Sequence, residues 1–199
     1  LTNIVQFFEK LLIVIILARF LEINVFGTYG LALTINGLFS QLLFGPFLSG
    51  FSRFNPISHK SKEEKFFLSS SSILWVKFLL FVLLISILSL PIFYLFNKSD
   101  FLQLFFLVIL YTLISNLCEL IVSYYQSLRK RIQVFSIRLI ELIGKVSLLV
   151  FVGFSSLETV FIYFILIHIL IVVINIDFIK HLVFIKNNEK VNYWREKII

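Results

Sequence analysis

Long apolar stretches alternate with short polar segments along the chain. A helix that crosses a bilayer needs about 20 mostly apolar residues. The pattern predicts an all-α, polytopic membrane helix bundle with six transmembrane helices, at residues 3–21, 26–51, 66–96, 101–126, 132–154 and 159–176. The first and fifth contain several charged residues and would fail a simple hydropathy threshold. We therefore expect one transmembrane domain over residues 1–176, followed by a basic cytoplasmic tail or linker over residues 177–199.

The predicted helix at residues 26–51 has one face of small and weakly polar residues. They recur at steps of three or four, which places them on one side of a helix: Gly30, Thr34, Gly37, Gln41, Gly45, Ser49 and Ser52. In a bilayer, such a face packs closely against a neighbour or lines a cavity. We expect it to meet the polar faces of the fourth and fifth helices, or a further lobe.

Basic residues gather in every second connection. Twelve of the 18 Lys and Arg residues lie in residues 53–65, 129–131 and 177–199, two lie on the opposite side, and four lie at membrane depth. The positive-inside rule then predicts a cytoplasmic-membrane protein with both termini in the cytoplasm.

Composition supports a membrane protein, since 59% of the residues are hydrophobic and only 15% are charged. Soluble domains carry roughly 25% charged residues. The net charge of +7 suits loops beside anionic lipid better than a nucleic-acid surface. The chain begins without methionine, which indicates a fragment or a processed product, and its single cysteine excludes an internal disulfide framework. No cofactor, metal site or catalytic constellation is predicted, so we expect no enzyme.

Charged side chains at membrane depth cost about 3 kcal/mol each and normally face a partner or water. Glu119 and Arg138 lie ten residues before and nine residues after Arg129, in two antiparallel helices. At about 1.5 Å per residue they reach nearly the same depth. We predict that Glu119 and Arg138 face each other or share a cavity.

Glu141 and Lys145 lie on the same face of the fifth helix as Arg138 and can pair with each other. Two interpretations stay open for these charges: a structural ion pair that holds the hairpin together, or a hydrated, net-basic cavity for an anionic ligand. Lys77 is expected to reach toward the interface, and Glu9-Lys10 to lie at the interface. His168 is expected to pack or hydrogen-bond within its own helix.

Three local motifs resemble the polysaccharide-biosynthesis (Wzx-type, O-antigen) flippases of the multidrug/oligosaccharidyl-lipid/polysaccharide exporter superfamily. They are Leu17-Ala18-Arg19-Phe20-Leu21 with Phe26-Gly27-Thr28-Tyr29, the helix end near Gly50 and Arg53, and the basic turn from Gln126 to Arg131. The chain has Glu22-Ile23-Asn24 where the family usually has a glycine in the first turn.

The resemblance implies one lobe of a two-lobed, flippase-like transporter that moves an undecaprenyl-diphosphate-linked oligosaccharide outward by alternating access for surface polysaccharide biosynthesis. Its partners would be the lipid-linked oligosaccharide, membrane lipids and a second six-helix lobe. Arg19, Arg53, Arg138 and Lys145 would attract the substrate, while Glu119 and Glu141 would balance charge or couple ions. The alternatives are a multidrug-exporter-like transporter, which predicts an acidic cavity, an integral-membrane enzyme, and a truncated protein that does not transport.

Overall fold

The computed structural model of the chain describes residues 2–60, 64–95, 99–154 and 156–183, and these residues form helices and no strand. The all-α prediction is therefore confirmed. In chain order the elements are α1 (Thr2–Phe20), α2 (Ile23–Phe39), the π-helical turn η1 (Ser40–Phe44), α3 (Gly45–Lys60), α4 (Glu64–Leu95), α5 (Ser99–Ser127), α6 (Arg131–Ser147), the π-helical turn η2 (Leu148–Val152), α7 (Leu157–Ile174) and α8 (Ile176–Val183).

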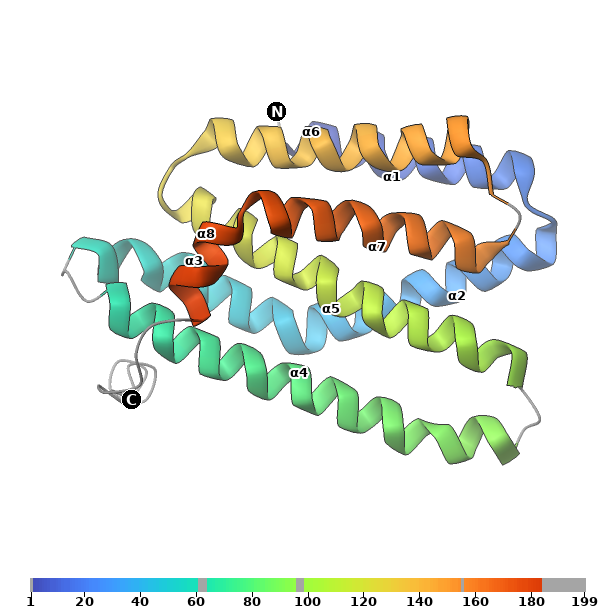
Figure 1. Cartoon of the computed structure of the whole chain (residues 1–199), viewed down its shortest axis with the longest axis horizontal. Helices are drawn as coiled ribbons and strands as arrows, with labels where there is room; N and C mark the ends of the chain where they lie inside the picture. The colour runs from blue at the N-terminus through green and yellow to red at the C-terminus, as the bar shows by residue number, and fades with distance from the viewer. Residues whose placement is uncertain (1, 61–63, 96–98, 155, 184–199) are drawn as a thin grey trace.

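The long helices lie roughly antiparallel, with α1 and α6 along one side of the bundle and α4 along the other (Figure 1). α5 lies between them and contacts α2, α3, α4, α6 and α7. The junctions of α1 with α2 and of α6 with α7 lie at one end, whereas α3 and α5 finish at the other end (Figure 1).

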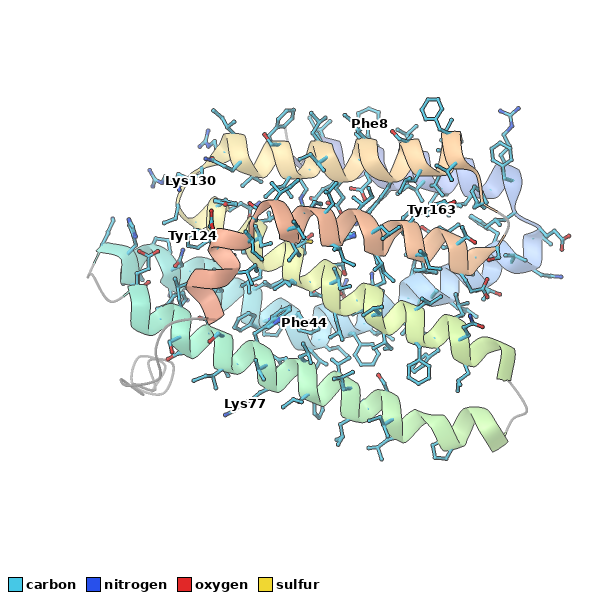
Figure 2. The ribbon with its side chains drawn as sticks, in the orientation of Figure 1. Phe8, Phe44, Lys77, Tyr124, Lys130 and Tyr163 are labelled. Carbon is cyan, nitrogen blue, oxygen red and sulfur yellow. The ribbon has the colours of Figure 1, made fainter. Side chains whose placement is uncertain are left out.

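Four helical segments are long and apolar enough to cross a membrane: residues 23–60, 67–88, 102–127 and 157–174. α1 and α6, which the sequence analysis also counted as spans, are not among them. Their charged residues lower their hydropathy, as expected from Glu9-Lys10 in α1 and from Arg138, Glu141 and Lys145 in α6. Large apolar side chains are exposed on several helices, for example Phe8 of α1 (Figure 2) and Leu84 of α4, and such an apolar surface suits contact with lipid.

The predicted bounds of the connection at residues 53–65 are wrong. The segment 53–65, expected to be a loop, continues as helix α3 to Lys60, and α4 already begins at Glu64. A contact remote in sequence supports this extension, since Asn55 Nδ2 donates to Ser127 Oγ at 2.6 Å. The expected tail also begins as helix α8, whose Phe178 is buried against Tyr124 with ring centroids 4.5 Å apart. Residues 184–199 of the predicted tail lie outside the described residues.

The turn η1 interrupts the long helix in which the small-residue face lies. The N–H of Gly45 reaches back to the carbonyl of Ser40, five residues earlier. Pro46 follows directly and has no N–H to continue the ordinary i→i−4 ladder. Single π-helical turns of this kind occur frequently at functional sites, and Ser40 and Gln41 both border a cavity.

Candidate functional site

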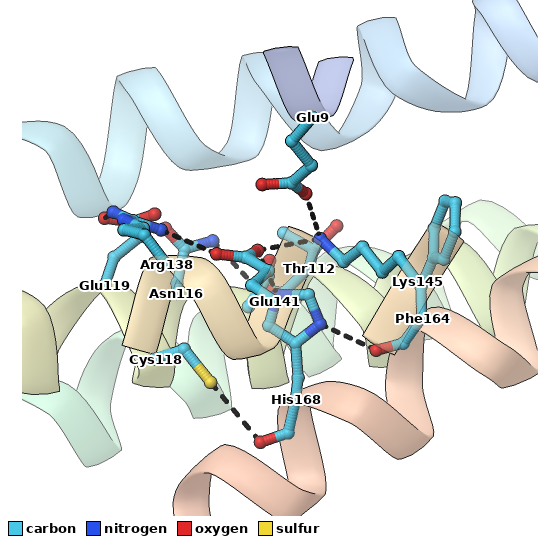
Figure 3. Close-up of polar contacts among 11 residues, drawn as sticks. Glu9, Thr112, Asn116, Cys118, Glu119, Arg138, Glu141, Lys145, Phe164 and His168 are labelled. Atoms are coloured by element: carbon cyan, nitrogen blue, oxygen red, sulfur yellow. Dashed lines mark hydrogen bonds and ion pairs between the residues drawn. The ribbon is translucent and has the colours of Figure 1, made fainter. Parts of the chain in front are cut away.

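A cavity of about 530 Å³ lies among α1, α2, η1, α5, α6 and α7. Charged and polar side chains occupy much of its wall, which is unusual for helices that could cross a membrane. Those that matter for its chemistry are Gln6, Glu9, Lys10, Ser40, Gln41, Asn116, Glu119, Arg138, Glu141, Lys145 and His168. This cavity is the candidate functional site, and most of its charged groups appear in Figure 3.

α6 supplies the centre of the site. Arg138, Glu141 and Lys145 are spaced by three and four residues, so all three side chains project from one face, and all three are buried. Arg138 Nη1 donates to Glu141 Oε2 at 2.9 Å, and Lys145 Nζ donates to Glu141 Oε1 at 2.7 Å. The carboxylate of Glu141 is therefore held between two cations of its own helix.

Each of these cations also binds a carboxylate from another helix. Arg138 Nη2 donates to Glu119 Oε2 of α5 at 2.6 Å, and Lys145 Nζ donates to Glu9 Oε1 of α1 at 2.7 Å. Glu119, Arg138, Glu141, Lys145 and Glu9 thus form one continuous chain of ion pairs across three helices (Figure 3). We call these five residues the charge chain. The predicted pairs Glu119–Arg138 and Glu141–Lys145 are confirmed.

His168 of α7 closes the charge chain from the inner side. Its Nε2 lies 3.0 Å from Glu141 Oε1, and its Nδ1 lies 2.7 Å from the carbonyl oxygen of Phe164 (Figure 3). Both neighbouring oxygens can accept a hydrogen bond from the ring. The prediction that His168 bonds within its own helix is confirmed, while its contact with Glu141 was not foreseen.

The small-residue face borders the same cavity at Gly37 and Gln41, and the neighbouring Ser40 also lines it. Asn116 of α5 links the two walls, since its Nδ2 donates to Ser40 Oγ at 2.9 Å. A methyl group added at Gly30 or Gly37 would meet no atom within 4 Å among the described residues. This part of the face therefore lies opposite the polar side of α5 and α6, as expected if it met the fourth and fifth predicted helices. At Gly30 and Gly37 the face is not covered by other described residues.

The predicted site residues fall into two groups. Glu119, Glu141, Arg138 and Lys145 come together in the cavity, whereas Arg19 and Arg53 are exposed and do not line it. The guanidinium of Arg53 instead lies over the ring of Phe54, 5.8 Å from its centroid.

The expectation of a net-basic cavity is wrong for the described lining. Glu9, expected at the interface, is buried and faces Lys145. Three carboxylates (Glu9, Glu119 and Glu141) therefore balance three cationic groups (Lys10, Arg138 and Lys145) around the cavity. A helical spacing could have pointed to Glu9, because Gln6, Glu9 and Ile13 share one face of α1 and all border the cavity.

Two further placements complete the comparison with the sequence. Lys10 is exposed at the cavity, and Lys77 is exposed on α4 and points away from the bundle (Figure 2). Among the described residues, no group of three or more His, Cys, Asp or Glu side chains is placed to hold a metal ion.

The chemistry of the cavity depends on the fact that Arg138 and Lys145 are already paired with carboxylates. Besides its two carboxylates, the guanidinium of Arg138 faces Gln6, whose amide oxygen, turned toward it, accepts from Nη2 at 2.7 Å. An anion that enters must therefore displace a carboxylate before it can contact Arg138 or Lys145. The more accessible of the outer carboxylates is Glu119, with 39% of its side chain exposed against 9% for Glu9.

The chain matches no family model, and no curated protein or solved structure matches it. The resemblance to the flippases therefore stays a prediction from the motifs quoted above, and the cavity has to be interpreted from its own chemistry.

Proposed function

We propose that the chain is one lobe of a membrane transporter that moves a lipid-linked, phosphate-bearing oligosaccharide across the cytoplasmic membrane by alternating access. The observation that carries this proposal is the charge chain at a cavity of about 530 Å³, where α1 and α6 meet the apolar helices α5 and α7. Charged groups at such a depth are costly and usually mark a substrate or ion pathway. In the finer form of the proposal, the substrate is the undecaprenyl-diphosphate-linked repeat unit of a surface polysaccharide.

In this proposal the charge chain exchanges its partners. Glu119 and Glu9 neutralise Arg138 and Lys145 while the cavity is empty. A diphosphate then replaces Glu119 at Arg138, because charge-assisted bonds from a guanidinium suit phosphate oxygens as well as carboxylates. Glu141 stays buried between the two cations and keeps them in place. Arg19 and Arg53 would act outside this cavity, at the two ends of the α1 to α3 hairpin.

The proposal includes a second lobe and a defined orientation. The open face at Gly30 and Gly37 would be covered by another six-helix lobe, which is where a substrate would be enclosed between two halves. The end that bears Arg53, Lys60 and Arg129–Arg131 would face the cytoplasm, in accordance with the positive-inside rule. No enzymatic step is part of the proposal.

A second candidate is an exporter of small cationic molecules. The burial of Glu9 favours it, because the charge chain contains three carboxylates and two permanently charged cations. In that case Glu9 and Glu119 would contact the substrate and Arg138 would be its competitor. A truncated protein that does not transport remains the third candidate, and the complete pairing of Arg138 and Lys145 is what a purely structural network would show.

The test is a flipping assay in proteoliposomes with this chain together with its second lobe and a fluorescent lipid-linked repeat unit. The double variants Glu119→Gln/Arg138→Gln and Glu9→Gln/Lys145→Gln each remove one acid and one base, so neither adds net charge to the cavity. We expect each to slow flipping at least about tenfold, the loss of roughly one charge-assisted contact. Lys77→Gln is the matched control, since its side chain points away from the bundle, and it should flip at the wild-type rate.

Two outcomes count against the proposal. Wild-type flipping by both double variants removes the charge chain from the transport path. Loss of cationic-dye export in Glu9→Gln, without any flipping activity in the wild type, favours the small-molecule exporter. Far-UV circular dichroism of every variant ensures that a loss of activity does not reflect a loss of helix.

A further inference from the structure

A second cavity, of about 610 Å³, lies at the end of the bundle where α3 and α5 finish. It is built from the last turn of α3, the first residue of α4 and the α5–α6 turn. Its lining consists of Pro56, His59, Lys60, Glu64, Tyr124, Ser127, Leu128, Arg129 and Lys130. We call it the end cavity. It shares no residue with the charge chain.

The end cavity has an excess of positive charge. Lys60, Arg129 and Lys130 face one carboxylate, that of Glu64. That carboxylate is already engaged, because Glu64 Oε2 lies 2.6 Å from His59 Nδ1 and Glu64 Oε1 accepts from the hydroxyl of Tyr124 at 3.3 Å. No ion pair of Lys60 or Arg129 occurs among the residues that the structure describes.

The basic side chains are not required to cap α5. The N–H of Lys130 bonds to the carbonyl of Tyr125 at 2.8 Å, and the N–H of Arg129 bonds to that of Gln126 at 2.9 Å. This is the pairing of a Schellman motif, which satisfies the last carbonyls of a helix through the backbone alone. A different role is therefore needed to explain why three cations surround this turn.

Arg129 occupies the position of that motif where glycine is usual. Its φ is 58°, and within the described chain it is the one residue other than glycine with a positive φ. An L-residue with a β-carbon is strained in this conformation, whereas glycine is not. Strained backbone conformations are frequent at ligand-binding sites, so the strain at Arg129 is consistent with a ligand in the end cavity.

The walls of the end cavity are held in place by contacts between helices. Asn55 of α3 donates to Ser127 Oγ at 2.6 Å, and Ser127 Oγ in turn donates to the carbonyl of Tyr124 at 2.7 Å. Lys130 Nζ lies 5.8 Å from the centroid of the Tyr125 ring, and both Tyr124 and Lys130 are at this end of the bundle (Figure 2). Lys60 therefore lies at the end of α3, and Arg129 and Lys130 lie in a turn that follows a helix end bonded to α3.

The position of the end cavity indicates its ligand. Two of the four candidate spans end at Lys60 and at Ser127, and both residues line the cavity. The ends of spans lie at the depth of lipid headgroups. We propose that the end cavity binds a phosphate group, either of an anionic lipid headgroup or of a free phosphate compound, through Lys60, Arg129 and Lys130. This proposal does not depend on transport.

The test compares lipid binding by native mass spectrometry of the full chain, titrated with phosphatidylglycerol or with phosphatidylcholine. The wild type should bind the first phosphatidylglycerol more tightly than phosphatidylcholine. Arg129→Gly/Lys60→Gln should weaken the phosphatidylglycerol affinity by about fivefold for each charge removed. Arg129→Gly is chosen because glycine accepts a φ of 58°, so this variant keeps the turn while losing the charge.

Arg131→Gln is the matched control, since Arg131 adjoins the turn but does not line the end cavity. It should keep the wild-type affinity. An equal loss in Arg131→Gln, or no preference for phosphatidylglycerol in the wild type, overturns the proposal. Competition by millimolar inorganic phosphate identifies a site for any phosphate compound, whereas binding that persists in phosphate identifies a lipid headgroup site.

Discussion

The two sides of α5 are packed in opposite ways. Toward α3 and α4 lies an apolar and aromatic cluster, in which Phe44 contacts Trp75 with ring centroids 4.9 Å apart and Phe51 contacts Phe67 at 5.2 Å. Toward α1 and α6 lies the charge chain, joined through Glu119. One helix thus separates a region held by packing from a region held by ion pairs.

The difference shows what stabilises helices in an apolar medium. Lipid tails are as apolar as side chains, so an apolar cluster is stabilised there by close packing rather than by escape from water. A buried ion is different, because lipid offers it no alternative partner. Lys145 therefore ties α6 to α1 through Glu9, across 136 residues of sequence, and this link should contribute more to stability than any single ring.

The largest effect is expected for Lys145→Met. The variant leaves the carboxylates of Glu9 and Glu141 without the cation that both contact. Removing one partner of a buried ion pair costs about 3–5 kcal/mol, because the remaining charge stays buried. The free energy of unfolding is measured by titration with sodium dodecyl sulfate in mixed micelles, followed by far-UV circular dichroism.

Glu9→Gln/Lys145→Met tests whether the cost comes from the unpaired charge. The double variant should recover part of the loss, since Glu141 keeps Arg138 and His168 as neighbours. Wild-type stability of Lys145→Met would show that water enters the charge chain freely and that the two sides of α5 do not differ as described.

A smaller effect is expected for Phe44→Ala, in the aromatic cluster. The Phe44 side chain is fully buried and packs against Trp75 and Phe78. Truncating a buried phenylalanine costs about 3–5 kcal/mol in soluble proteins, and we expect about 2 kcal/mol here, because the gain from leaving water is largely absent in lipid. The same unfolding titration measures it.

Phe81→Ala is the matched control for Phe44→Ala. Phe81 lies on α4 with 47% of its surface exposed, so its truncation should change stability by less than about 0.5 kcal/mol. If Phe44→Ala were more destabilising than Lys145→Met, packing rather than ion pairing would dominate the bundle.

Local sequence information was sufficient to predict part of the charge chain. The spacing of Arg138, Glu141 and Lys145, together with the depth of Glu119 counted from the α5–α6 turn, predicted two of the four ion pairs of the charge chain. The helical class followed from the apolar runs in the same way.

Local sequence information did not predict the contacts between residues that are far apart in the sequence. Nothing near Glu9 identifies Lys145 as its partner, and with an adjacent Lys10 the segment resembles an interfacial one. Asn55 and Pro56 are typical of a loop, yet the bond from Asn55 to Ser127, 72 residues away, accompanies a helix that continues to Lys60. The partner residue in such a contact is known only once the arrangement of the helices is known.

The smallest effects, and of opposite sign, are expected for two glycine-to-alanine variants that border the charged side of α5. At Gly144, the added methyl group would lie 2.6 Å from Ile167 Cδ1 of α7. Overpacking costs about 1–3 kcal/mol and the higher helix propensity of alanine returns about 1 kcal/mol, so Gly144→Ala should be destabilised by about 1 kcal/mol in the same titration.

Gly37→Ala is the same substitution at a position where the added methyl group has no close neighbour. A methyl group at Gly37 would meet no atom within 4 Å among the described residues, so only the gain in helix propensity, about 0.5–1 kcal/mol, should remain. A stabilised Gly37→Ala beside a destabilised Gly144→Ala means that the small-residue face is uncovered in the isolated chain. A destabilised Gly37→Ala would instead mean that another surface packs on this face. Measuring both variants before and after a second lobe is added would show whether that lobe packs there, because only the effect at Gly37 should change.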